Sequence, residues 1–346
     1  MGVLRVRGYA LPTGEHIDLY ADGDSWTTDP VAGAELVGEG WLLPGLVDAH
    51  THPGAEAPGT PFDEQLLRAD LRDHAAAGVT LIRAPGLAGQ PPDWFGVAPD
   101  LPRSVHAGPW FAQHGQFFDG WGRRPSHAEL PGLAAEQARR TGWAKLIGDW
   151  RGEDEPIPAD VLAAVAAAVH AVGGRVAIHA NHSQTSKSAV AAGVDSIEHG
   201  MRLEPDLLPR MAAAGIALTP TLSVIEGALT EAGGRGNGEF EAAVRAHRQL
   251  AVQAAEAGVT LLAGTDSRPH GRITDEVSAL VAAGLRPHDA LGAASWAARS
   301  YLGWAGLESG APADAVVYDA DPRADLAQLA SPAAVILRGR LVHRRP

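Results

Sequence analysis

Short apolar runs and apolar helical stretches alternate along most of the chain. Five of the helical stretches end at a glycine that leads directly into a β-branched run, as Gly78 does before VTLIRAP and Gly258 before VTLLAGTD. Glycine adopts the left-handed conformation beyond a helix end at little cost, so these glycines predict helix ends. Runs of this kind give eight predicted strands: LVDAHTH, VTLIRAP, SVHAGPW, WAKLIGDW, RVAIHA, VDSIEHG, IALTPTL and VTLLAGTD. Because nearly continuous apolar strands are typical of parallel strands buried on both faces, the pattern predicts an α/β fold, a (β/α)8 TIM barrel.

An open, doubly wound parallel sheet would show the same alternation of helices and strands. Such a sheet often carries a glycine fingerprint after its first strand, and none follows LVDAHTH here. The one glycine-rich cluster, residues 233–238, lies between two helical stretches, which favours a loop. We therefore favour the barrel over the open sheet.

Both ends of the chain differ in pattern from the middle. Residues 1–43 alternate β-prone runs with turn signals and show no helical period, which predicts a small antiparallel sheet. After two further helices, predicted at 273–284 and 286–303, strands return in ADAVVYDA and AAVILRGRLVHRR. We expect the two ends, 1–43 and 310–346, to form one small β-sandwich domain. The barrel would then occupy residues 44–309.

The composition restricts the functional classes. The chain has 346 residues, 45% of them hydrophobic and 20% charged, which allows a large buried core. A formal net charge of -13 disfavours a nucleic-acid partner, because such binding needs clustered Lys and Arg. Cysteine is absent, so a metal would need nitrogen and oxygen ligands. With no apolar run of about 18 residues and no apolar signal region, we expect no membrane contact and a cytoplasmic location.

Polar residues stand at the ends of the otherwise apolar strands. Alternate side chains of an extended strand share a face, so His50 and His52 lie side by side while Thr51 faces away. Four more polar side chains occupy the ends of other strands: Lys145, His179, His199 and Asp266. Any one of them alone could be a core residue with satisfied hydrogen bonds. In a barrel, however, all of these ends surround one axis, and buried polar groups need partners, so the set predicts a shared metal site.

These segments resemble the amidohydrolase superfamily, in particular its imidazolonepropionase-like and metal-dependent dipeptidase-like branch. The similarity covers nearly the whole chain, including a C-terminal run from GAPADAVVYDADP to ILRGRLV that resembles the segment completing the family's small β-sandwich. The motifs that carry the resemblance are PGLVDAHTH, AKLIGDW, VAIHA, GVDSIEHG, LTPTL and AGTDS.

The resemblance implies a hydrolase with two divalent metal ions, zinc in the first instance. The implied ligands are His50, His52 and Asp266 for the more buried ion, and His179 and His199 for the second. Lys145 would bridge both ions as N6-carboxylated lysine, since an ammonium group between two cations would be repelled. Without this modification a one-metal site is the alternative. Asp266 would also act as general base and then general acid while water attacks an amide, cyclic amide or ester.

Substrate contacts are expected from the loops that follow the strands. His114, in the loop GPWFAQHG, matches a Gly-His neighbourhood of the family and could donate a hydrogen bond to the substrate carbonyl, although a solvated histidine explains it equally well. The candidate substrate-binding residues are Trp110, Arg151, Arg202 and His270. Aromatic rings with nearby cations suit a small molecule with an apolar group and a carboxylate, although the rings could also only pack the loops. No tyrosine follows LTPTL, where dipeptidase-like relatives tend to place one, so a dipeptide substrate is in doubt.

Other classes and roles stay open at this point. A one-metal deaminase of the same superfamily would not need Lys145, and a non-catalytic interaction barrel would be expected to have lost ligands. Exposed barrel helices commonly pair, so a homo-oligomer is an open expectation. Glu198 is expected to face away from His199 and to act as a supporting carboxylate. Helix-surface positions suffice for the remaining helical histidines, which are His74, His170, His247 and His288.

Overall fold

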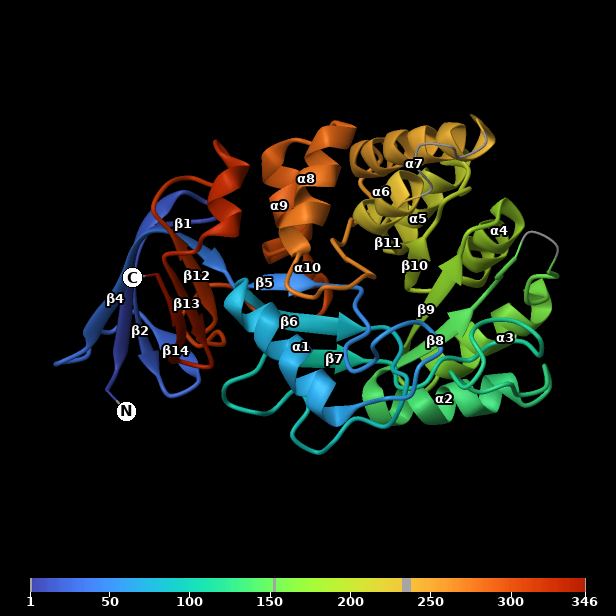
Figure 1. Cartoon of the computed structure of the whole chain (residues 1–346), viewed down its shortest axis with the longest axis horizontal. Helices are drawn as coiled ribbons and strands as arrows, with labels where there is room; N and C mark the ends of the chain where they lie inside the picture. Colours follow the sequence, from blue (N-terminus) through green and yellow to red (C-terminus); the bar gives the residue numbers. More distant parts are fainter. Residues whose placement is uncertain (1, 152–153, 232–237, 346) are drawn as a thin grey trace.

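The computed structural model describes residues 2–151, 154–231 and 238–345 and shows a mixed α/β fold (Figure 1). The loop predicted at 233–238 falls almost entirely outside the described residues. The helices are α1 (Glu64–Ala76), α2 (Leu130–Thr141), α3 (Ala159–His170), α4 (Ser183–Ala192), α5 (Leu208–Ala214), α6 (Leu222–Glu231), α7 (Gly238–Glu256), α8 (Ile273–Ala283), α9 (Pro287–Ala293) and α10 (Trp296–Tyr301), with 3₁₀ turns η1 (Pro205–Leu207) and η2 (Leu326–Ala330). In the part of the chain that the structure describes, none of these helices has both the length and the apolar composition to cross a membrane.

Seven of the predicted strands form two parallel sheets. One contains β5 (Leu46–Asp48), β6 (Val79–Ala84) and β7 (Arg103–His106); the other contains β8 (Trp143–Ile147), β9 (Arg175–Ala180), β10 (Ser196–His199) and β11 (Ala217–Thr219). The eighth run, VTLLAGTD, contributes only an isolated parallel bridge between Leu218 and Leu261.

Backbone hydrogen bonds connect the two sheets at both edges. The Phe111 amide donates to the Lys145 carbonyl at 2.8 Å, between the end of the first sheet and β8. At the other edge the Leu262 amide donates to Leu218 at 2.9 Å, and the Ala49 amide donates to Ala263 at 2.8 Å. This parallel arrangement with helices outside it is consistent with the predicted TIM barrel.

Two of the glycines expected to end helices directly follow the last helical residue. Gly193 after α4 has a φ of 73°, and Gly215 after α5 has a φ of 69°. A side chain at either position would be strained in this left-handed conformation. Each helix therefore stops at its glycine, and the chain turns directly into the next buried strand.

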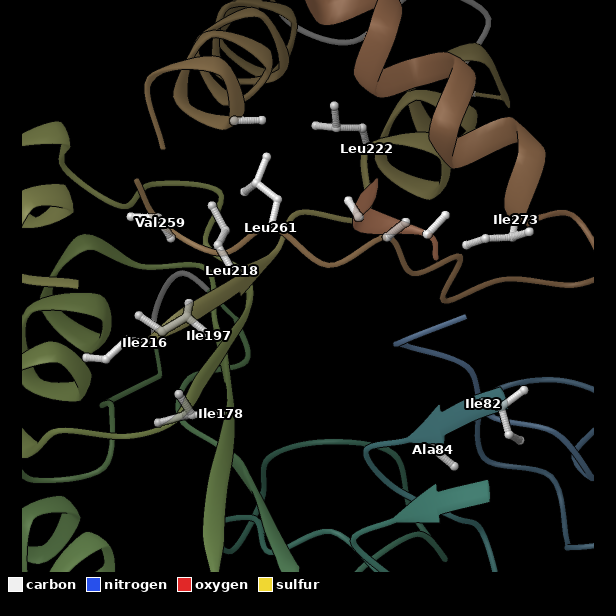
Figure 2. Packing of buried hydrophobic residues seen from close by; sticks show 14 of the residues in the cluster. Ile82, Ala84, Ile178, Ile197, Ile216, Leu218, Leu222, Val259, Leu261 and Ile273 are labelled. Carbon is white, nitrogen blue, oxygen red and sulfur yellow. The ribbon is translucent and has the colours of Figure 1, made fainter. Parts of the chain in front are cut away.

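Alternation along the strands separates the core from the site. Ile178, Ile197 and Leu218 stand on neighbouring strands and pack in the large cluster between strands and helices (Figure 2). Side chains of an extended strand alternate between faces, so the residues between these positions point to the strands' other side. His179, which follows Ile178, reaches the central cavity in this way.

A third sheet, with seven strands, combines both ends of the chain and lies beside the larger body (Figure 1). Its order is β14 (Arg340–Arg344), β13 (Ala334–Leu337), β12 (Ala315–Tyr318), β4 (Glu35–Pro44), β1 (Leu4–Ala10), β2 (Glu15–Asp22) and β3 (Ser25–Thr27). The prediction of a purely antiparallel head was wrong, because β1 pairs with β4 in parallel. The expected pairing of the two ends occurs between β4 and β12, while the two-layered sandwich stays a prediction.

Candidate metal centre

Three predicted ligands meet at the ends of strands that are distant in sequence. His50 Nε2 lies 3.6 Å from Asp266 Oδ1, and His52 Nε2 lies 3.2 Å from the same oxygen. The two Nε2 atoms are 3.2 Å apart. One ligand atom from each residue thus lies within 4.8 Å of the others, a group that could hold a metal ion.

The other two predicted histidines border this group. His199 Nε2 lies 3.8 Å from Asp266 Oδ2, and the rings of His199 and His50 have centroids 5.1 Å apart. The His179 ring follows at 4.6 Å from the His199 ring. All four imidazoles and the Asp266 carboxylate therefore lie in one continuous cluster.

Two of the candidate ligands have unusual backbones. His199 has a φ of 64° and Asp266 a φ of 48°, both in the left-handed region that costs a non-glycine residue free energy. At His199 this turn ends strand alternation, so Glu198 and His199 both face the site. The expectation that Glu198 faces away was therefore wrong, because regular alternation does not continue to the end of β10.

Hydrogen bonds orient the histidine rings. The Glu198 carboxylate accepts from His50 Nδ1 at 2.7 Å, and the Gly86 carbonyl accepts from His52 Nδ1 at 2.7 Å. His199 Nδ1 lies 2.8 Å from the Thr221 hydroxyl. With Nδ1 occupied, Nε2 of His50 and of His52 presents its lone pair to the site, which is the arrangement a metal ligand needs.

Arg83 supports this arrangement and was missed in the sequence. Its guanidinium donates to both carboxylate oxygens of Glu198, at 2.9 and 2.8 Å, and both side chains are almost completely buried. Burial opposes ionisation of Glu198, but Arg83 and Lys145 outweigh it and hold the pKa of that carboxyl well below its usual range. A lone arginine inside the apolar strand VTLIRAP was the signal, since a buried charge needs a partner.

Lys145 is buried beside the histidines. Its side chain lines the same cavity, and within the described structure Nζ has no hydrogen-bond partner. Burial lowers its pKa to about 8, partly opposed by Glu198. Burial, and then Lys145, also lower the pKa of His179 to about 4. Near neutral pH the His179 imidazole is therefore uncharged, and Lys145 loses its proton more readily than an ordinary lysine.

The cavity beside these residues has a volume of about 680 Å³, and its lining includes several Trp and Phe rings. Trp110 lines it, with its ring 5.1 Å from that of His52 and stacked on Trp121 at 4.8 Å. His270 also lines it, and its Nδ1 lies 3.1 Å from the Thr51 hydroxyl. The structure thus brings two of the four candidate substrate-binding residues to the cavity.

Three other predicted site residues are not brought there. His114, Arg151 and Arg202 are exposed, and they are not among the described residues that line the cavity. Arg202 instead lies 4.0 Å from Glu239, near the start of α7. All three belong to loops, whose paths are not fixed by the alternation that positions strand residues.

Two histidines assigned to helix surfaces are buried. His74 is fully buried, with Nε2 3.2 Å from the Thr51 hydroxyl, and His247 Nε2 donates to the Pro220 carbonyl at 2.9 Å. These interpretations were wrong because both side chains lie on the inner faces of their helices: His74 in the last turn of α1 and His247 in the middle of α7. His170 is exposed as expected and pairs with Asp195 at 2.9 Å.

Comparison with known proteins assigns the chain to a family. The sequence profile of the amidohydrolase family matches residues 139–342. The chain therefore belongs to the amidohydrolase family and is a hydrolase that acts on carbon–nitrogen bonds. Members of this family generally use metal ions and act on small molecules, which agrees with the cluster of His50, His52 and Asp266.

One relative and two solved structures show how far the similarity extends. An uncharacterized protein of Mycobacterium tuberculosis is 40% identical over 358 residues, covering 97% of this chain and 95% of that protein. A Xaa-Pro dipeptidase with bound methionine in its active site superposes with a TM-score of 0.82 at 21% identity, covering 98% of this chain and 99% of that one. A prolidase complexed with N-methylphosphonate-L-proline gives 0.83 at 22% identity, covering 99% and 100%. At sequence identities of 21% and 22%, the structural similarity shows a shared fold and no more.

Proposed function

We propose that this protein is a metal-dependent amide hydrolase with a two-metal centre at the carboxyl ends of its barrel strands. In this proposal residues 44–309 form the barrel and the two chain ends form the small appended domain. The observation that carries the proposal is the meeting of His50, His52 and Asp266 within 4.8 Å, bordered by the other predicted ligands in the same cavity.

The residues present fit such a centre. His50, His52 and Asp266 would hold one ion, and His179 and His199 the second. Imidazole nitrogens and a carboxylate suit zinc, and burial lowers the pKa of His50, His179 and His199, which preserves the lone pairs of these three imidazoles. The surroundings of Lys145 support a bridging role. Its buried Nζ has no hydrogen-bond partner among the described residues, and the lowering of its pKa from 10.5 to about 8 increases the share of free amine that can react with carbon dioxide. The resulting carbamate would offer one oxygen to each ion.

Each residue then has a defined task in hydrolysis. Bound divalent ions would activate water and polarise the amide carbonyl. Asp266 would take the proton of the attacking water on a carboxylate oxygen and deliver it to the departing nitrogen, which then leaves as an amine. Glu198 and Thr221 would hold the imidazoles of His50 and His199 in place, and the cavity lining would keep bulk water away from the reacting amide.

Metal analysis and mass spectrometry test this proposal directly. We expect two zinc ions per chain, an intact mass increased by one carbon dioxide, and amide hydrolysis that is lost with chelator and restored by zinc. One ion per chain together with full activity of a Lys145→Ala variant would instead favour the one-metal deaminase. Failure to bind any divalent ion would refute the proposal.

A further inference from the structure

One wall of the cavity consists of aromatic rings. The stack of Trp110 on Trp121 continues into Phe118, whose ring lies 5.5 Å from that of Trp121 and 4.8 Å from that of Trp150. The wall begins at the candidate ligands, since Trp150 lies 5.7 Å from the His179 ring. A substrate with its reacting carbonyl at the ligands would therefore place its neighbouring groups against these rings.

Another part of the lining is apolar and comes from different elements. Helix α6 contributes most of it, and the lining residues concerned are Met201, Val224, Ile225, Ala228 and Phe240. Val224 and Ile225 follow the N-terminus of α6, which the buried Glu276 fixes by accepting from the amides of Leu222 and Ser223 at 2.9 and 2.7 Å. The helix that forms this apolar surface is thus held firmly in position.

Cations that could bind a carboxylate are scarce in the described lining. Its lysine and arginine are Lys145, which belongs to the candidate metal centre, and Arg268. Arg268 already forms a two-point ion pair with Asp70, at 2.7 and 2.6 Å, and donates to the Ala55 carbonyl at 3.1 Å. The predicted cations Arg151 and Arg202 lie outside the lining, whereas the exposed Glu56 adds a negative charge to it.

These observations lead to a substrate class. We propose that the enzyme acts on neutral amides with aromatic or other bulky apolar substituents and disfavours substrates with a free carboxylate, such as dipeptides. A buried carboxylate without a partner is costly, whereas aromatic groups gain from burial against rings. This inference rests on the proposed function and specifies its substrate.

A matched pair of substrates tests it. N-(2-phenylethyl)benzamide differs from N-benzoyl-L-phenylalanine only by lacking the carboxylate, and the zinc-loaded enzyme should cleave the neutral amide with a kcat/KM at least about tenfold higher. A preference for the carboxylate compound would overturn the inference and leave amide hydrolysis intact. Calorimetric titration of an Asp266→Asn variant with both compounds separates the two proposals. If neither compound is cleaved, the proposal of amide hydrolysis fails. Tighter binding of the neutral amide would still support the substrate class, whereas equal or weaker binding would overturn that proposal as well.

A designed cation provides a second, independent test. Ile225→Arg would supply the missing positive charge in the apolar lining, and Ile225→Met changes the same side chain without adding charge. We expect the preference for the neutral amide to fall at least about tenfold in Ile225→Arg relative to Ile225→Met. Equal preferences in two variants with native circular dichroism would show that this wall does not contact the substituent, and would overturn the inference.

Discussion

The buried pair of Glu198 and Arg83 makes the strongest prediction about the supporting structure of the site. Glu198→Gln retains the shape of the side chain but removes its charge. Arg83 would then stay buried with only neutral acceptors, among them the Ala49 carbonyl at 2.7 Å and the hydroxyls of Ser196 and Thr219 at 3.2 and 3.1 Å. Breaking a buried ion pair in this way costs about 3–5 kcal/mol.

The same substitution should weaken metal binding. Glu198 accepts from His50 Nδ1 at 2.7 Å, so its carboxylate sets the ring orientation and basicity of a candidate ligand. Loss of such an outer partner typically lowers metal affinity about 10- to 100-fold. Glu198→Gln is therefore expected to reduce both the stability of the metal-free protein and the affinity of the protein for metal.

Urea unfolding of the metal-free protein and zinc competition with a chelator measure the two effects separately. Glu204→Gln is the matched control, because Glu204 is only partly buried and its ion pair with Lys187, at 2.8 Å, should contribute less than about 1 kcal/mol. Equal unfolding free energies of the two variants would refute the role of the buried pair. A large loss of stability with unchanged zinc affinity would refute only the proposal that Glu198 orients His50 for metal binding.

Three further predictions concern the site and its surroundings. Asp266→Asn should lower kcat about 10²- to 10⁴-fold while removing far less zinc, and an equal loss of both would contradict its role as the proton carrier. Lys145→Ala should retain one zinc ion instead of two, so two ions in metal analysis would exclude the carbamate bridge. Burial raises the pKa of Glu276 from 4.5 to about 7, so between pH 4.5 and 7 this carboxyl is protonated in the folded protein and ionised in the unfolded chain. Its stability relative to Glu276→Gln should therefore fall by up to about 3 kcal/mol as pH rises from about 4.5 to 7, and a constant gap in urea unfolding over this range would contradict the assignment.

The local sequence pattern was sufficient to predict those features that depend only on residues close together in the chain. Glycine fixes helix ends, and the period of two in strands places His50 beside His52 and brings His179 to the interior. Each rule involves only near neighbours in sequence, so it can be read without the fold. The family motifs then grouped the candidate ligands on separate strands into one predicted set.

Other features depend on contacts between distant segments. The parallel pairing of β1 with β4 has no local signal, and neither has the partner of Arg83, which stands on another strand. The left-handed backbone at His199 turns that side chain to the same side as Glu198, against the alternation expected along the strand. His114 and Arg202 were assigned by loop position, and loops follow paths that the rest of the structure determines.

The order of strands in the terminal sheet has a consequence for biosynthesis. β4 emerges from the ribosome early, whereas β12, its antiparallel neighbour, is translated only after the whole central body. During that interval the edge of β4 from Trp41 to Pro44 exposes unpaired amides and carbonyls next to apolar side chains, a combination that promotes aggregation. The β4 edge therefore stays without its β12 partner for most of translation, which exposes it to non-native pairing during that time.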